Sequence, residues 1–165
     1  MKEFCIHGVS SIILRKIDKE KYILIQQRKK GLDSFETGLI EIPCGKVKKG
    51  ESVFECLRNK VFIETGLKVT KIYGESNYTS LNLNNYEVIN YVPFFSAQNI
   101  MENYPIVIDT FICETEGEPI SESQDARNIR WISIENLNQL LQDHESLFYP
   151  MVVVPLKQFI KMEMV

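Results

Sequence analysis

The segment 45–67, GKVKKGESVFECLRNKVFIETGL, constrains the fold of this chain more than any other part of the sequence. It opens with a lysine-rich stretch between two glycines, which predicts a turn. Ser52, followed three residues later by Glu55, matches a capping box and predicts the start of a helix. Gly66 predicts the end of that helix, because glycine adopts the left-handed C-cap conformation without strain. The sequence therefore predicts a tight loop that leads directly into a helix.

Strand and helix signals alternate along the rest of the chain, without internal repeats. Runs rich in β-branched and aromatic residues predict strands at 4–14, 22–27, 39–43, 69–78, 86–95, 106–114 and 129–132. We expect the first two strands to form a hairpin, the Asn-rich turn 82–85 to join the fourth and fifth, and residues 29–38 to form a loop. Apolar residues at helical spacing predict helices at 134–141 and 151–162. This pattern indicates one α+β domain over residues 1–165, with a mixed β-sheet between layers of helices (α-β-α).

The composition excludes several classes of protein. The formal net charge is only −3 and no long block of like charges occurs, which argues against a nucleic-acid partner. No apolar run approaches the roughly 20 residues that a membrane span requires, and charged residues interrupt the N-terminal segment where a signal peptide is apolar. We therefore expect a cytoplasmic protein that does not act on a membrane. The four cysteines lack C-x-x-C spacing, so we expect reduced, mostly buried thiols rather than a zinc site.

Residues 45–67 resemble the Nudix box of the Nudix hydrolases, a family that includes MutT-like and ADP-ribose pyrophosphatase-like members. The box runs Gly, five residues, Glu, seven residues, then Arg-Glu-hydrophobic-any-Glu-Glu-any-Gly-hydrophobic. Six positions of this chain are in register with it: Gly45, Glu51, Val61, Glu64, Gly66 and Leu67. The resemblance extends over about residues 4–142, because the segment 39–45 resembles the family's Glu-hydrophobic-Pro-Ala-Gly motif and Trp131 lies in a matching late strand. It implies the Nudix fold and cleavage of a nucleoside diphosphate linked to another moiety.

The resemblance also implies a site for Mg²⁺ or Mn²⁺. Carboxylates at i, i+3 and i+4 of a helix point to one place, and Mg²⁺ prefers oxygen ligands. The implied metal ligands are Glu51, Glu64 and the backbone carbonyl of Cys44. Many members have a further Glu six residues before the Trp; the residue with that spacing is Asp125, and Glu122 is a nearby alternative. We therefore predict Glu64, Glu51, Asp125 and Glu122 as catalytic residues and a nucleotide-containing small molecule as the partner.

Three positions of the box carry residues of different chemistry. The family's Arg is Asn59, which cannot form the Arg–Glu ion pair that braces the loop. The first Glu of the Arg-Glu pair is Lys60, which brings a positive charge to the place of a divalent cation, and the first Glu of the Glu-Glu pair is Ile63, which offers no ligand. Two functions follow. The chain is either a divergent hydrolase whose magnesium arrives with the substrate, which we favour, or a catalytically inactive Nudix-fold module that binds a nucleotide or a protein.

Each predicted site residue also has a purely structural explanation. Glu51 suits the start of a helix, where the helix dipole favours a carboxylate. Glu64 is consistent with a solvated charge at the helix end, and Asp125 and Glu122 are consistent with acidic side chains of a surface loop. The aromatic side chains of residues 78–95 either stack on a base or pack on a strand face. Edge strands and the N-terminal hairpin leave a homodimer open.

Overall fold

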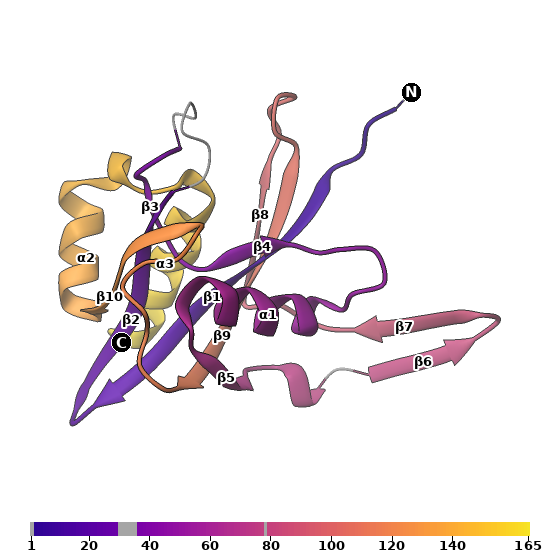
Figure 1. Ribbon diagram of the computed structural model, residues 1–165, viewed down its shortest axis with the longest axis horizontal. Coiled ribbons are helices and arrows are strands. Elements are labelled where there is room, and N and C mark those ends of the chain that lie inside the picture. Colours follow the sequence, from indigo (N-terminus) through magenta and orange to yellow (C-terminus); the bar gives the residue numbers. More distant parts are fainter. Residues whose placement is uncertain (1, 30–35, 78) are drawn as a thin grey trace.

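The computed structural model describes residues 2–29, 36–77 and 79–165 (Figure 1). The elements in chain order are β1 (Ile6–Ile17), β2 (Glu20–Arg28), β3 (Ile40–Glu41), β4 (Cys44–Lys46), α1 (Val53–Thr65), β5 (Lys68–Ile72), the 3₁₀ turn η1 (Glu75–Asn77), β6 (Thr79–Leu83), β7 (Tyr86–Asn90), β8 (Phe95–Asn99), β9 (Ile106–Glu116), β10 (Ala126–Ser133), α2 (Ile134–Asp143), the 3₁₀ turn η2 (Glu145–Leu147) and α3 (Pro150–Glu163). No helix within these ranges is long and apolar enough to cross a membrane.

A mixed sheet forms the centre of the molecule. Its main strands lie in the order β10-β2-β1-β9-β5, and β3, β4 and β8 pair with β2, β1 and β9 respectively. β1 and β9 run parallel, whereas the other pairs are antiparallel. The predicted hairpin of the first two strands is confirmed, since β1 pairs with β2 through a tight turn.

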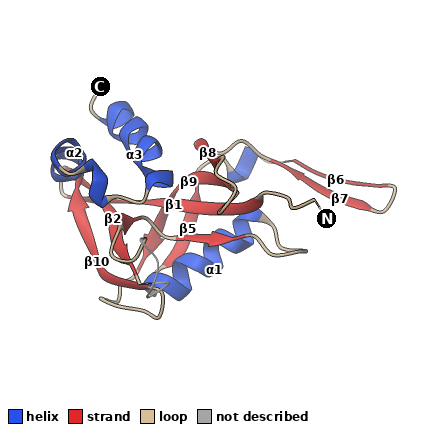
Figure 2. Cartoon of the chain, turned by 90° about the horizontal axis from the view of Figure 1, so that it is seen from above, coloured by secondary structure: helices blue, strands red, loops and turns tan. Residues whose placement is uncertain are grey.

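Both faces of the sheet are buried, because alternate residues of a strand point to opposite sides. In β1, Ile12 belongs to one core and Ile13 to the other, and in β2 the neighbours Ile23 and Leu24 divide in the same way. Residues of α2 and α3 complete the first core, and residues of α1 complete the second. Figure 2 shows the two groups of helices on opposite sides of the sheet. The predicted α+β fold with α-β-α layers is therefore confirmed.

The sheet is split along one side of β1, and this split positions the candidate site. β2 pairs with β1 from Leu14 to Ile17, and β4 pairs with it from Gly8 to Ser10. Beyond the first pairing β2 leaves β1 and continues between β3 and β10. Polar side chains of β2, β3 and α1 meet where the strands separate.

The region 68–99 differs from its prediction. Four short strands, β5 to β8, replace the two long strands expected at 69–78 and 86–95. A turn at Gly74 (φ 91°) and η1 separate β5 from β6, and residues 91–94 separate β7 from β8. The Asn-rich turn is present, with Asn84 and Asn85 at the positive φ values (50° and 64°) that a type I′ hairpin turn requires. It joins β6 to β7, which form a separate hairpin that projects from the body (Figures 1 and 2). Tyr78 lies outside the described residues.

The loop and helix predicted for residues 45–67 are present. Ser52 Oγ accepts a hydrogen bond from the Glu55 N–H (3.1 Å), and Glu55 Oε2 accepts one from the Ser52 N–H (2.9 Å), so the capping box is complete. Gly66 ends α1 with a φ of 76°. The break predicted at Pro43 is also confirmed, since β3 ends before it and β4 begins after it. Of the predicted loop 29–38, residues 30–35 lie outside the described ranges.

Each of the four cysteines is a thiol outside any disulfide: Cys56 and Cys113 are buried, Cys44 is half-buried and Cys5 is exposed. Burial raises the pKa of Cys56 to about 11 and that of Cys113 to about 12. The thiolate is the reactive form, so we expect a thiol reagent at about pH 8 to modify Cys5 rapidly and the two buried thiols only after unfolding. Mass spectrometry of the labelled protein measures this. Equal labelling of Cys5 and Cys113 in the folded protein contradicts the packing described here.

Candidate active site

Two carboxylates are buried where β2 separates from β1. Glu41 of β3 is 3% exposed and Glu64 of α1 is 1% exposed. The amide Nε2 of Gln26 donates a hydrogen bond to each, at 3.2 Å from Glu41 Oε1 and 3.2 Å from Glu64 Oε2. The backbone N–H of Cys44 donates a further bond to Glu64 Oε2 at 3.3 Å. Glu64 is therefore a buried acid stabilised by donors, and the alternative of a solvated helix-end charge is wrong.

Arg28 of β2 supplies the positive charge for this buried group. Its Nη1 lies 2.5 Å from Glu41 Oε2, and its Nη2 lies 3.2 Å from Glu36 Oε2. The guanidinium stacks over the ring of Tyr149, 4.4 Å from its centroid. Burial by itself lowers the pKa of Arg28, but nearby negative groups, chiefly Glu41, raise it above its ordinary value. Arg28 therefore stays charged and forms a buried ion pair with Glu41.

Lys60 follows a path that glycine at position 45 permits. A Cβ on Gly45 would lie 2.2 Å from Lys60 Cγ, 2.6 Å from Cδ and 2.7 Å from Cε. The aliphatic part of Lys60 consequently lies flat against the backbone of β4. Ile63, one turn further along α1, is 57% exposed.

Two adjacent cavities open beside these groups. The first has a volume of about 630 Å³ and is lined by four cationic side chains, Arg28, Lys46, Lys48 and Lys60, together with Glu36 and other residues. The second has a volume of about 710 Å³ and extends between β8 and the start of α3, where its wall includes Met101, Met151, Val154 and Pro155. Both cavities share Glu36, Tyr104 and Tyr149 as lining residues.

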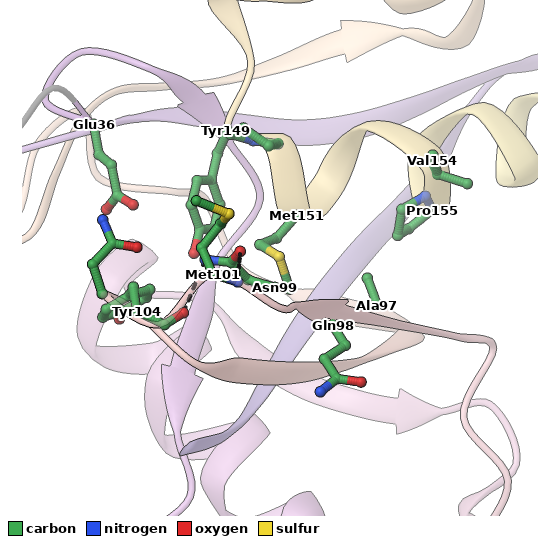
Figure 3. A pocket seen from close by; sticks show the side chains of 12 residues that line it. Glu36, Ala97, Gln98, Asn99, Met101, Tyr104, Tyr149, Met151, Val154 and Pro155 are labelled. Atoms are coloured by element: carbon green, nitrogen blue, oxygen red, sulfur yellow. Dashed lines mark hydrogen bonds between the residues drawn. The ribbon is translucent and has the colours of Figure 1, made fainter. Parts of the chain in front are cut away.

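The two shared tyrosines come from segments that are far apart in the sequence. Tyr149 lies at the start of α3, and Tyr104 lies in the loop between β8 and β9. Figure 3 shows both near Glu36, with Val154 and Pro155 at the other end of the larger cavity. Each ring contacts a cation, since Arg28 lies over Tyr149 and the Lys46 Nζ lies 5.4 Å from the Tyr104 ring centroid. A cationic region and an aromatic region are therefore directly adjacent.

Glu51 lies apart from the buried carboxylates. Its Oε2 accepts a hydrogen bond from the Lys48 N–H (3.0 Å), and its Oε1 accepts one from Asn59 Nδ2 (3.4 Å). The Lys48 backbone bond is the main cause of the lowered pKa of Glu51. Both terminal nitrogens of the neighbouring Arg58 bind Glu75, at 2.7 and 2.5 Å. Glu51 lines a separate hollow beside the turn before α1.

The two acids predicted from the late loop lie near the end of β2. Glu122 forms an exposed ion pair with Lys29 at 2.5 Å, and this hydrogen bond lowers the pKa of Glu122. The backbone carbonyl of Asp125 accepts a hydrogen bond from the Lys29 N–H at 3.0 Å. Trp131 is half-buried, with the Arg15 guanidinium over its ring at 4.2 Å. The site roles of Glu122 and Asp125 stay predictions.

The donor set does not fit a divalent cation. Within the described ranges, no three His, Cys, Asp or Glu side chains are grouped so that they could hold a metal ion. The Gln26 amide donates to Glu41 and Glu64 together, and the Cys44 N–H also points at Glu64. Glu51, a second predicted ligand, belongs to a different hollow. These carboxylates are arranged to accept hydrogen bonds within the protein rather than to converge on a cation.

Sequence reasoning missed the residues that hold Glu64 in place. Gln26 and Arg28 are two positions apart in a strand, so they share one face, and this spacing was a usable signal. Glu41 stands between Ile40 and Ile42, and an acid within an apolar strand indicates a buried partner. Tyr104 and Tyr149 gave no comparable signal, because only the packing of distant segments brings them together. In contrast, Tyr91 and Phe94 of the aromatic group considered above pack against the cores.

A family model described as NUDIX domain matches residues 7–151, whereas no curated protein matches the sequence. Among solved structures, the chain is similar to the E. coli ORF135 protein, with 21% identity and a TM-score of 0.65 over 96% of this chain and 91% of that one. It is similar to the NUDIX domain of Shewanella oneidensis NrtR complexed with ADP ribose (11% identity, TM-score 0.67, 99% and 91% coverage). It is also similar to a C. elegans Ap4A hydrolase in a binary complex (11% identity, TM-score 0.57, 95% and 96% coverage). At these identities the solved structures establish the fold alone.

Proposed function

The chain belongs to the Nudix family. From this membership and from the geometry of the cavities, we propose that the protein binds a small molecule that contains a nucleoside diphosphate. The main support for this proposal is that a cationic cavity lies next to a cavity that is aromatic and partly apolar. Lys46, Lys48 and Lys60 line the first, and Tyr104 and Tyr149 lie at the boundary that the two cavities share.

The chemistry of such a molecule matches this arrangement. Ammonium groups form charge-assisted hydrogen bonds with phosphate oxygens, and a base stacks on an aromatic ring. The volumes of about 630 and 710 Å³ suit a small molecule. ADP-ribose and Ap4A, which are named with two of the similar structures, both combine phosphates with a base and therefore serve as first probes.

Cleavage of the diphosphate is the second candidate function. It is favoured by Glu64, which is in register with a glutamate of the box. The Glu64 carboxylate accepts a hydrogen bond from the N–H of Cys44, and Cys44 lines the cavity. Nudix hydrolases typically use a divalent metal. For this second function, Glu64, Glu51, Asp125 and Glu122 are the proposed site residues, and the metal is one that the substrate itself holds.

A panel of potential substrates separates the two functions. ADP-ribose, Ap4A, nucleotide sugars and nucleoside triphosphates are incubated with Mg²⁺, with Mn²⁺ and with a chelator, and release of nucleoside monophosphate or phosphate is measured. Turnover that the chelator stops and that Glu64→Gln abolishes establishes a hydrolase. Binding of one of these compounds, detected by calorimetry without any turnover, establishes the binding function alone.

The nucleotide proposal makes a specific prediction for Tyr104. Replacing Tyr104 with Ala removes a ring that faces both cavities, and we expect affinity for the bound nucleotide to fall roughly tenfold or more, since a base–aromatic stack contributes about 1–3 kcal/mol. The matched control is Tyr86→Ala, because Tyr86 is 72% exposed on the projecting hairpin. Equal affinities of the two variants, measured by calorimetry, exclude Tyr104 as the ring on which the base stacks.

A further inference from the structure

Lys60 enters the cationic cavity across Gly45. Gly45 has room for the Lys60 side chain only because it lacks a Cβ. Gly8, on the neighbouring strand, is less constrained, since a Cβ there would lie 3.3 Å from the Gly45 carbonyl oxygen. Gly8, Gly45 and Lys60 all line the same cavity. The backbone is therefore shaped so that Lys60 reaches this space.

The cavity carries an excess of positive charge. Lys46, Lys48 and Lys60 line it, and among the described residues none of the three forms an ion pair with a carboxylate. Glu36, the acid on the cavity wall, is bound by Arg28 at 3.2 Å. The lysine ammonium groups are thus the unneutralised charges that a ligand would meet.

The nearby carboxylates do not offset this excess. Glu41 and Glu64 are 3% and 1% exposed and lie behind the wall, where Gln26, Arg28 and the Cys44 N–H satisfy them. A cation would bind these acids only by displacing the donors that already bind them. An anion, in contrast, would meet lysine ammonium groups directly.

We infer that Lys60 provides the positive charge for a diphosphate in place of a divalent cation, so that this cavity binds a diphosphate without metal. This inference rests on the proposed nucleotide-binding function and specifies how its phosphates are held. A lysine ammonium is a compact charge that binds phosphate oxygens without precise orientation. Lys46 and Lys48 surround the same ligand, and Tyr104 fixes Lys46 through its ring.

Inorganic pyrophosphate in the presence of a chelator is the direct test, with affinity measured by calorimetry. We expect pyrophosphate to bind without metal and Lys60→Met to weaken it roughly tenfold or more, as expected for loss of a hydrogen bond between charged groups. Lys71→Met is the control, because it removes the same charge from an exposed lysine of β5 that contacts Tyr73. No binding in chelator, or equal affinity of the Lys60 and Lys71 variants, overturns the inference.

The same experiment with ADP-ribose and Ap4A separates this inference from the proposed function. Nucleotide binding that requires Mg²⁺ and is insensitive to Lys60→Met overturns the role of Lys60 and leaves nucleotide binding intact. Pyrophosphate binding that depends on Lys60, without binding of any nucleotide on the panel, supports the role of Lys60 and contradicts the nucleotide proposal.

A double-mutant cycle tests the geometry independently of the choice of nucleotide. Gly45→Ala places a Cβ on the path of Lys60, so we expect it to weaken pyrophosphate binding about as much as Lys60→Ala does. In the Lys60→Ala background the path is empty, and Gly45→Ala should then have little further effect. Additive losses contradict the contact between Lys60 and Gly45.

Discussion

Replacing Arg28 with Met is expected to lower the free energy of unfolding by about 3–5 kcal/mol, because it leaves Glu41 as a buried charge without its cation. Met keeps much of the side-chain length, so lost packing contributes little to this change. Arg28 also binds Glu36 and stacks on Tyr149, and both contacts disappear in the variant. Urea unfolding, followed by circular dichroism, gives the free energy directly.

The adjacent residue provides the control for Arg28. Lys29→Met removes an ion pair with the exposed Glu122, and exposed pairs contribute about 0–1 kcal/mol. The double variant Arg28→Met, Glu41→Leu removes the buried charge together with its partner, so we expect it to recover part of the lost stability. A loss of similar size for Lys29→Met and Arg28→Met would mean that the buried ion pair is not the cause.

Phe111→Ala is expected to destabilise the protein by about 3–5 kcal/mol, because it leaves a cavity in the core beneath α1. Phe111 of β9 is 1% exposed, and its ring contacts Phe54 of α1 and Tyr91, with centroid separations of 5.5 and 6.0 Å. This cluster fixes the helix that carries Lys60 and Glu64. Thermal and urea unfolding of the variant measure the loss.

An exposed phenylalanine of the same helix serves as the control for Phe111. Phe62 is 61% exposed, so Phe62→Ala should change the free energy of unfolding by no more than about 0.5 kcal/mol. If Phe62→Ala is as destabilising as Phe111→Ala, Phe62 is buried in solution. The outer side of α1 is then in contact with another molecule.

The predicted catalytic residues divide into two groups in the structure. Glu64 is buried beside the cavity wall at Cys44, whereas Glu51 binds the turn before α1 and Glu122 forms a surface ion pair. The network around Glu64 instead includes Gln26 and other residues of the central strands, which the box pattern does not contain. Register within the box therefore pointed to Glu64 and did not identify the residues that surround it.

The sequence by itself determined the local structure and the layers. The capping box at Ser52, the C-cap at Gly66 and the hairpin turn at Asn84 depend on residues a few positions apart, so short-range chemistry decides them. The alternation of Ile12 and Ile13 between two cores follows from the period of a strand, which is why α-β-α layers could be predicted. The box register over residues 45–67 also pointed to the family that the NUDIX model matches.

Only the tertiary structure decided what the charged residues do. Gln26 and Glu64 are 38 positions apart, and Arg28 and Glu41 are 13 apart, so their contacts depend on how the split sheet packs against α1. The role of a carboxylate depends on its burial and on the donors around it, and neither is encoded by its neighbours in the chain. Folding placed Glu64 behind the cavity wall and Lys60 across Gly45 into the cavity, and this arrangement of desolvated acids and accessible lysines favours an anionic ligand.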